Sequence, residues 1–286
     1  METLVQRLVA NPHDQEALAY AHQAGASDPR SYAALLERVG MATQDPTFSS
    51  HWLSEAANVW AVALGDAHRA AQILMQAIDK DPTQQTAADR LAQLYRERGE
   101  IKGLAALIER RAKALMPHVG QSPEMRATVA AMYEELGRLW TDAPLAQPRK
   151  ALEYYRRAIE IDPRSVYAIY GARELYKQAQ QWADAIGLFD MEHALVDDPA
   201  RKVALYQDEA AVRQQAGDRV GATQVLRNAR AYLPEDPGLM QELGAMIVER
   251  AKGGDVKEIL RKQGDASARL GDIMGDLSRR MRERGE

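Results

Sequence analysis

One stretch of the sequence, residues 151–163 (ALEYYRRAIEIDP), returns along the chain and limits what the chain can fold into. Ala151, Tyr155 and Ala158 are spaced i, i+4 and i+7, so they share one face of a helix. The pair Asp162-Pro163 then ends that helix, because proline cannot continue it. The same order of small, large, small and proline residues begins again at Ala70 and Ala222, with weaker copies at Leu104 and Ala185.

The spacing of these copies indicates a repeat protein. The first members of successive copies are 34, 47, 34 and 37 residues apart. A period of about 34 residues with this pattern resembles the tetratricopeptide repeat (TPR) family over residues 47–252, and more loosely on both flanks. The resemblance implies an all-α fold, an α-solenoid of about six antiparallel helix pairs. It also implies a right-handed superhelix whose first helices line a concave groove.

The family pattern places small residues where the two helices of a repeat touch, because a larger side chain would push the helix axes apart. The residues at these places are Ala92, Gly137, Ala210 and Gly244 on first helices and Ala77, Ala158 and Ala229 on second helices. Three charged residues break the pattern: Arg111, Glu192 and Arg173. Either those pairs are tilted or the register is shifted by one residue there.

The flanks of the repeats predict three parts of the chain. Residues 1–46 read as divergent N-terminal helical repeats, with short helices near 2–10, 15–25 and 30–40. Residues 47–252 form the TPR-like solenoid, and Thr47 to Ser50 offer N-caps for its first helix. Residues 253–286 are predicted to be capping helices. Their apolar stripe, Leu270, Ile273, Met274, Leu277 and Met281, either closes the last repeat, docks a second copy or further repeats, or lies on an anionic membrane.

Composition narrows the function classes. The 286 residues are 46% hydrophobic and 27% charged, with a net charge of -4, which is typical of a folded protein and argues mildly against general nucleic-acid affinity. There is no cysteine, so disulfides and thiolate metal sites are excluded. We see neither a secretory signal nor an apolar run long enough to cross a membrane, and we expect a cytoplasmic protein. The predominance of Arg over Lys is weakly indicative of a bacterial source.

The family geometry selects the residues that would face the groove. They are Asp89, Gln93, Arg96, Glu134, Arg138, Tyr167, Tyr170, Glu174, Lys177, Gln207 and Gln214. They predict a peptide-binding groove, because tyrosine stacks on side chains and arginine binds carboxylates bidentately. The alternative is a solvated helix face with internal pairs such as Glu134–Arg138. The Lys and Asn set with which some family members clamp a C-terminal carboxylate is absent at these positions.

The sequence offers little for catalysis. The six histidines have no metal-site spacing, no nucleophile–base arrangement is visible, and we predict no metal, no cofactor and no enzymatic activity. Five aromatic residues could be binding hot spots but are more often core: Tyr154, Tyr155, Trp60, Trp140 and Trp182. We therefore expect a non-catalytic scaffold that holds a peptide segment or partner domain within a multiprotein assembly. The alternatives are a self-assembling structural subunit and, more remotely, an RNA-binding helical repeat or an enzyme; the sequence does not identify the partner.

Overall fold

The structure is a computed structural model that describes residues 2–250, and within that range it is entirely helical. Fourteen α-helices, one π-helical turn and one 3-10 turn account for its regular structure. The elements are α1 (Glu2–Ala10), α2 (Gln15–Ser27), α3 (Pro29–Ala42), α4 (Pro46–Asn58), η1 (Val59–Ala63), α5 (Ala67–Lys80), α6 (Gln85–Glu97), α7 (Ile101–Leu115), η2 (Met116–His118), α8 (Pro123–Thr141), α9 (Pro148–Ile161), α10 (Val166–Gln178), α11 (Trp182–Leu195), α12 (Pro199–Gln215), α13 (Arg219–Ala229) and α14 (Pro237–Arg250).

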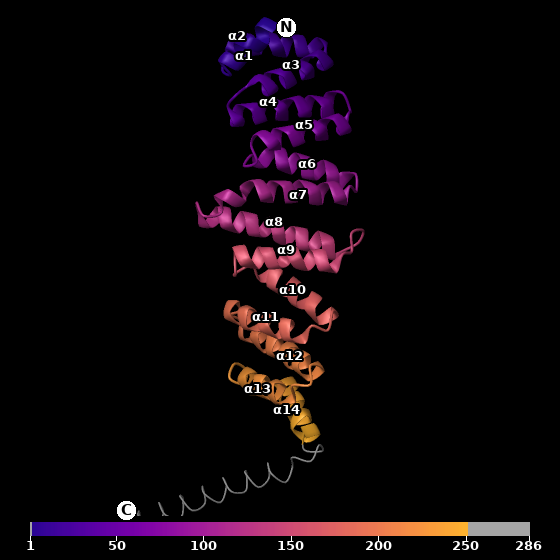
Figure 1. Cartoon of the computed structure of the whole chain (residues 1–286), viewed down its shortest axis with the longest axis vertical. Helices are drawn as coiled ribbons and strands as arrows, with labels where there is room; N and C mark the ends of the chain where they lie inside the picture. The colour runs from indigo at the N-terminus through magenta and orange to yellow at the C-terminus, as the bar shows by residue number, and fades with distance from the viewer. Residues whose placement is uncertain (1, 251–286) are drawn as a thin grey trace, which may run out of the picture. The chain divides into compact units, whose positions relative to one another are not determined.

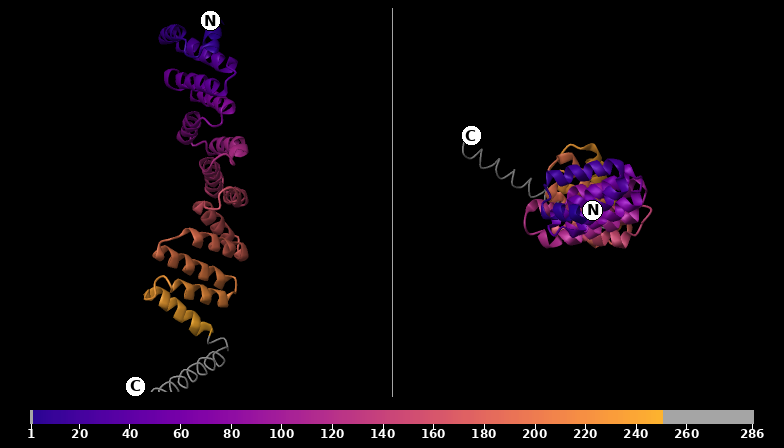
Figure 2. Two further views of the ribbon diagram at one scale, coloured as in Figure 1. Left: turned by 90° about the vertical axis from the view of Figure 1, so that its left-hand side faces the viewer. Right: turned by 90° about the horizontal axis from the view of Figure 1, so that it is seen from above.

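The chain divides into two compact units, which we describe separately. Unit 1 is Met1–Ala172 and unit 2 begins at Arg173, so the boundary falls within α10. In each unit, successive helices run antiparallel and pack on their neighbours in the sequence (Figures 1 and 2). The all-α prediction and the pairing of helices are therefore confirmed. The right-handed winding of the complete solenoid stays a prediction from the resemblance.

Aspartate and proline set most helix starts. The Asp14, Asp28, Asp45, Asp66, Asp198 and Asp218 side chains each accept a backbone N–H three residues on, at the N-cap of α2, α3, α4, α5, α12 and α13. Pro29, Pro46 and Pro199 follow three of these caps at the first helical position, where proline's missing N–H costs nothing. Helices α2 and α3 lie close to their predicted ranges for this reason, and α1 matches its predicted range as well.

The prediction that Thr47 to Ser50 cap the next helix was wrong. Asp45 is the cap, and its carboxylate accepts the Phe48 N–H at 2.9 Å. Ser49 and Ser50 are instead buried inside α4. Their hydroxyls donate to the Gly40 carbonyl at 2.7 Å and to the Gln84 side chain at 2.6 Å. These serines are small residues at helix contacts, with their polar atoms satisfied by neighbouring helices.

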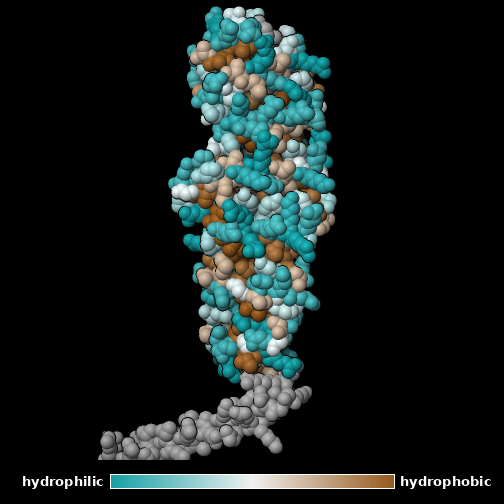
Figure 3. Space-filling model, in the orientation of Figure 1, coloured by the Kyte–Doolittle hydropathy of each residue, from teal (hydrophilic) through white to brown (hydrophobic). Residues whose placement is uncertain are grey.

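The core of each unit lies where small residues let helices approach. Ala77, Ala158, Ala210 and Ala229 have no exposed surface, as predicted. The prediction for Gly244 is not tested, because the helix expected to pack against it, near 255–263, lies outside the described residues. Charged and polar side chains cover most of the visible surface, with apolar patches between them (Figure 3).

Tyr155 shows how tight the close contacts are. A Cβ added to Gly137 of α8 would lie 2.5 Å from its ring, and one added to Gly171 of α10 would also lie 2.5 Å from it. Real Cβ atoms do not approach other atoms so closely. Glycine is therefore required on both sides of the Tyr155 ring. Tyr154 and Tyr155 are both buried, in agreement with the core prediction, whereas Trp60, Trp140 and Trp182 are half-buried.

Two of the three charged residues at small places are explained by pairing with each other rather than by a shifted register. In unit 2, Arg173 of α10 is buried and donates to Glu192 of α11 at 2.9 Å, so two exceptions to the pattern satisfy each other. The Arg173 guanidinium also lies 4.4 Å above the Phe189 ring and binds Glu174 and Asp208. The third exception, Arg111, lies in unit 1 and has different surroundings, described below.

The predicted capping helices near 255–263 and 266–284, with their apolar stripe, lie outside the described residues.

Candidate functional site

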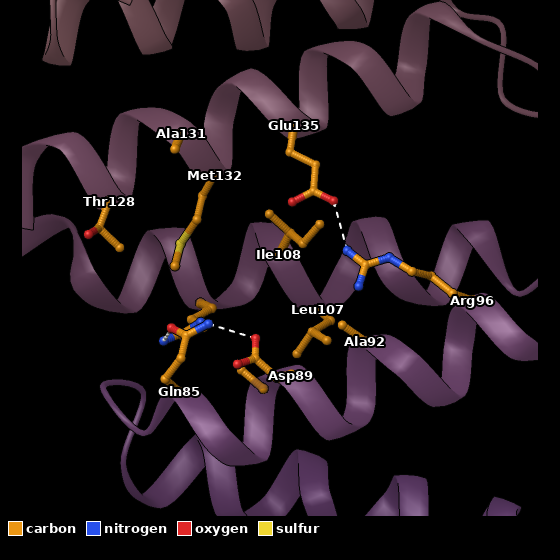
Figure 4. A pocket seen from close by; sticks show the side chains of 12 residues that line it. Gln85, Asp89, Ala92, Arg96, Leu107, Ile108, Thr128, Ala131, Met132 and Glu135 are labelled. Carbon is orange, nitrogen blue, oxygen red and sulfur yellow. Dashed lines mark hydrogen bonds and ion pairs between the residues drawn. The ribbon is translucent and has the colours of Figure 1, made fainter.

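A trough crosses the face of unit 1 between α6, α7 and α8 (Figure 4). Its volume is about 330 Å³. The two first helices, α6 and α8, form the walls, and the second helix α7 forms the floor. The lining residues are Gln85, Ala88, Asp89, Ala92, Arg96, Leu107, Ile108, Arg111, Thr128, Ala131, Met132 and Glu135.

The trough combines apolar and charged surface. Leu107, Ile108 and Met132 give it an apolar floor and flank. At one end Arg96 of α6 reaches across to Glu135 of α8, with 3.1 Å between nitrogen and oxygen (Figure 4). At the other end the Gln85 amide donates to Asp89 at 2.7 Å. Polar groups therefore mark both ends of a mainly apolar floor, which is the usual character of a site that orients a bound chain.

A second, smaller cavity lies on the other side of α6. Its volume is about 190 Å³, and it is bounded by the end of α4, by η1, by α5 and by α6. Arg90, Gln93 and Glu97 of α6 line it, together with Ala61 of the π-helical turn and Leu74 of α5. Helix α6 is thus a wall shared by two neighbouring cavities.

The structure distributes the predicted groove residues of α6 and α8 between these two cavities and their surroundings. Asp89 and Arg96 line the larger trough, and Gln93 lines the smaller cavity. Glu134 does not form the pair with Arg138 that the alternative interpretation supposed. It accepts the Ser165 hydroxyl at 2.7 Å, while Arg138 lies 3.9 Å from Glu135.

The predicted groove residues of α10 and α12 have two kinds of surroundings. In unit 1, Tyr167 and Tyr170 are 75% and 51% exposed. In unit 2, Lys177 is held by Glu174 at 3.0 Å and Asp208 at 2.7 Å. Burial lowers the pKa of Lys177, but hydrogen bonds to those two carboxylates raise it by more, so its net pKa lies above the ordinary value.

The remaining two predicted residues lie on α12. Gln207 donates to Glu242 of α14 at 3.1 Å, and Gln214 is exposed. The ion pairs of Lys177 and this hydrogen bond tie the first helices of unit 2 to one another. Their participation in a binding groove stays a prediction.

Several trough residues were missed at the sequence level. Thr128, Ala131, Met132 and Glu135 follow one face of α8 at helical spacing, and Arg138 continues that face. Sequence reasoning took Glu134 instead of Glu135, because α8 belongs to the lengthened repeat where the period gives no register. Arg111 carried a visible signal: it is a charged residue at a place where the pattern has alanine.

Among the described residues, no helix is both long enough and apolar enough to cross a membrane. No group of three His, Asp or Glu side chains within residues 2–250 is arranged to hold a metal ion.

The helix pairs decide the type of fold. Within unit 1, α4–α5, α6–α7 and α8–α9 are antiparallel pairs, and within unit 2 α12–α13 is another, with buried alanine or glycine at most of the close contacts. Copies of the pattern recur about every 34 residues. The described residues therefore form an α-solenoid of stacked helix pairs, the architecture that the resemblance to the TPR family predicts.

Comparisons with known proteins return solved structures of low sequence identity. No family model matches the sequence, and the search of curated proteins finds no significant relative. Similar solved structures include YrrB, a TPR protein with an unusual peptide-binding site. It is 18% identical, with 68% of this chain and 91% of that chain covered and a TM-score of 0.41. Pseudomonas aeruginosa pilF is 13% identical, with 85% and 98% covered and a TM-score of 0.37.

Proposed function

We propose that this TPR solenoid is a non-catalytic interaction scaffold that binds a peptide segment or partner domain of another protein in the trough of unit 1. The observation that carries the proposal is the trough itself: an open channel between two first helices, with an apolar floor and polar groups at both ends. The partner is a protein of unknown identity, and we place the assembly in the cytoplasm.

The dimensions of the trough suit a short extended segment. Ligand cavities are typically about 300–1,000 Å³, and the larger trough is at the lower end of that range. The neighbouring cavity beyond α6 gives a longer segment a second place for a side chain. Exposed Tyr167 and Tyr170 on α10 add aromatic surface of the kind that dominates interface energies.

A self-assembling structural subunit is the second candidate, and one observation favours it. Helix α14 exposes Met240, Ile247 and Val248 by 42%, 43% and 53%. Apolar side chains grouped on an exposed helix face can mediate association between copies. Sedimentation of the intact chain across a range of concentrations distinguishes this role, because only self-assembly gives a mass that rises with concentration.

The trough can be tested by filling it. We expect a phage library of random twelve-residue peptides, selected on the intact chain, to yield binders that Ala131→Phe abolishes. Ala131 is exposed on the wall of α8, so the added ring enters the trough without disturbing the core. The control is Ala106→Phe, which makes the same change at an exposed position of α7 outside the trough.

Two results would contradict the proposal. If no peptide is enriched, the trough does not bind extended segments. If both phenylalanine variants bind the selected peptides as the wild type does, the binding surface lies elsewhere. Circular dichroism of each variant checks that the helices are intact.

A further inference from the structure

Arg111 is a buried cation on the floor of the trough. It lies on α7 at the place where the repeat pattern has alanine, and only 7% of its surface is exposed. Its Nε–H donates to the Pro82 carbonyl at 2.8 Å, and one terminal N–H donates to the Gln85 side-chain oxygen at 2.7 Å. These bonds fix the guanidinium at the end of the trough where α6 begins.

Both acceptors of Arg111 are neutral. Within the described residues, no carboxylate lies at ion-pair distance from it, although Asp89 is linked to it indirectly through the Gln85 amide. Burial lowers the pKa of Arg111, and Asp89 and Asp81 offset part of that effect. The guanidinium stays charged at neutral pH, because the pKa of arginine is far above it. A buried charge without a counter-charge is energetically costly.

Among the described residues the other buried arginine, Arg173, has its charge balanced by carboxylates. Arg173, also at a small-residue place, binds Glu192, Glu174 and Asp208 in unit 2. In the trough, the second cation Arg96 is likewise paired, with Glu135. Arg111 differs from both. A guanidinium has five N–H donors, and three of those of Arg111 have no acceptor among the described residues.

We propose that the trough recognises an acidic peptide, and that a glutamate or aspartate side chain of the bound segment pairs with Arg111. This inference rests on the proposed function and adds the chemistry of the partner. A carboxylate accepts two parallel N–H groups of a guanidinium, which gives both strength and orientation. The carboxylate comes from a side chain rather than a chain end, because Arg111 lies on the floor and a bound backbone would run above it.

The arrangement differs from the carboxylate clamp of some TPR proteins. That clamp uses Lys and Asn on successive first helices, and this chain lacks the set. Here the cation is on a second helix, α7, which forms the floor of the trough. Leu107 and Ile108 also line the trough, so a carboxylate bound to Arg111 would lie beside apolar side chains, where opposite charges attract more strongly than in water.

The test is a double-mutant cycle on the peptides selected with the phage library. In one arm, each Glu or Asp of a synthetic, C-terminally amidated binder is changed to Gln or Asn. In the other arm, Arg111→Met removes the charge from the protein while keeping an unbranched side chain. We expect that changing one acidic residue of the peptide to its amide weakens binding to the wild-type protein at least roughly tenfold. The same change should cause no further loss of affinity for the Arg111→Met protein.

Two additional measurements keep the result decisive. Arg111→Lys retains the charge and should retain part of the preference for the acidic peptide over its amide variant. The proposal therefore remains testable even if Arg111→Met does not fold. The same binder with a free C-terminal carboxylate should bind no better than the amidated form. If the free form alone depends on Arg111, the site reads a chain end and the side-chain assignment is wrong.

The outcomes separate this inference from the proposed function. If peptides bind in a way that Ala131→Phe blocks, but no acidic position couples to Arg111, the trough is a peptide site and the inference is overturned. If no peptide binds, both are overturned. If a single-stranded oligonucleotide binds instead and loses affinity in Arg111→Met, the cation serves phosphate and the partner is not an acidic peptide.

Discussion

At the scale of single residues, the packing around Tyr155 carries the clearest consequence for stability. Its ring fills the space between α8 and α10, and Gly137 and Gly171 leave no room for a methyl group on either side. The ring cannot move away from one glycine without meeting the other. Tight contacts of this kind define the register of a repeat, because a shift of one residue would place a larger side chain there.

Gly137→Ala should therefore destabilise the chain. Overpacking typically costs about 1–3 kcal/mol, which exceeds the gain of up to about 1 kcal/mol from alanine's higher helix propensity. Gly187 of α11 is a matched control, because no described atom lies within 4 Å of a Cβ placed there. Gly187→Ala should raise the urea midpoint while Gly137→Ala lowers it. A stabilised Gly137→Ala variant would mean that the ring and its neighbours yield easily.

A second prediction at this scale concerns acid sensitivity. Burial raises the pKa of Glu209, but hydrogen bonds from His193 at 2.9 Å and Arg213 at 2.7 Å lower it by more, so its net pKa is below the ordinary 4.5. A carboxylate with a lowered folded-state pKa stabilises the protein above the ordinary pKa. That contribution is lost as the pH falls through the folded-state value.

Glu209→Gln should consequently be less stable than wild type near pH 6–7, and the difference should shrink below about pH 4. Urea titrations at several pH values measure it, with hydrogen exchange of α11–α13 reporting on the region itself. Exposed Glu153 of α9 gives the control Glu153→Gln, which changes the same charge without these hydrogen bonds. An equal difference at all pH values would show that Glu209 acts by packing alone.

At the scale of elements, the π-helical turn η1 joins three helices of unit 1. Trp60 within it donates its indole N–H to Glu37 of α3 at 2.6 Å, and Arg69 of α5 pairs with the same carboxylate. The wider π turn also brings Ala61 to the smaller cavity. Such turns often occur next to functional sites.

Trp60→Phe should destabilise unit 1 by roughly 1.5 kcal/mol, because it removes a hydrogen bond to a charged, largely buried acceptor. Trp140→Phe is the comparison, since the indole N–H of Trp140 has no acceptor in the structure. Thermal unfolding, followed by circular dichroism, compares the loss of stability in the two variants. Equal losses would show that indole volume matters and the bond to Glu37 does not.

The helices could be predicted from the sequence where local chemistry decides them. The breaks at Asn11-Pro12 and Asp28-Pro29 placed α1 to α3 closely, and the small-residue pattern located the contacts of α5, α9 and α13. The start of α4 was missed because Ser49 and Ser50 look like caps but fill a helix contact. The groove face of α8 was missed because its repeat is longer than the others. Pairing of Arg173 with Glu192 could not be foreseen, since it depends on which helices meet.

At the scale of the whole chain, helices contact their neighbours in the sequence, so stability should be a sum of local terms. Gly137 and Glu209 lie in different units and share no contacting residue. The double variant Gly137→Ala, Glu209→Gln should lose the sum of the two single losses to within about 0.5 kcal/mol. Equilibrium unfolding of the four proteins measures this. A larger deviation would reveal coupling between the two units.

The shared position of α6 has a consequence for how recognition could change over time. One face of this helix borders the larger trough and another borders the smaller cavity, so a substitution that tilts or rotates it alters both at once. Two side chains of a bound segment would then be selected together rather than one by one. The specificity of such a scaffold therefore depends on how a whole helix is placed. A new partner is acquired more readily by exchanging a repeat than by changing a single residue.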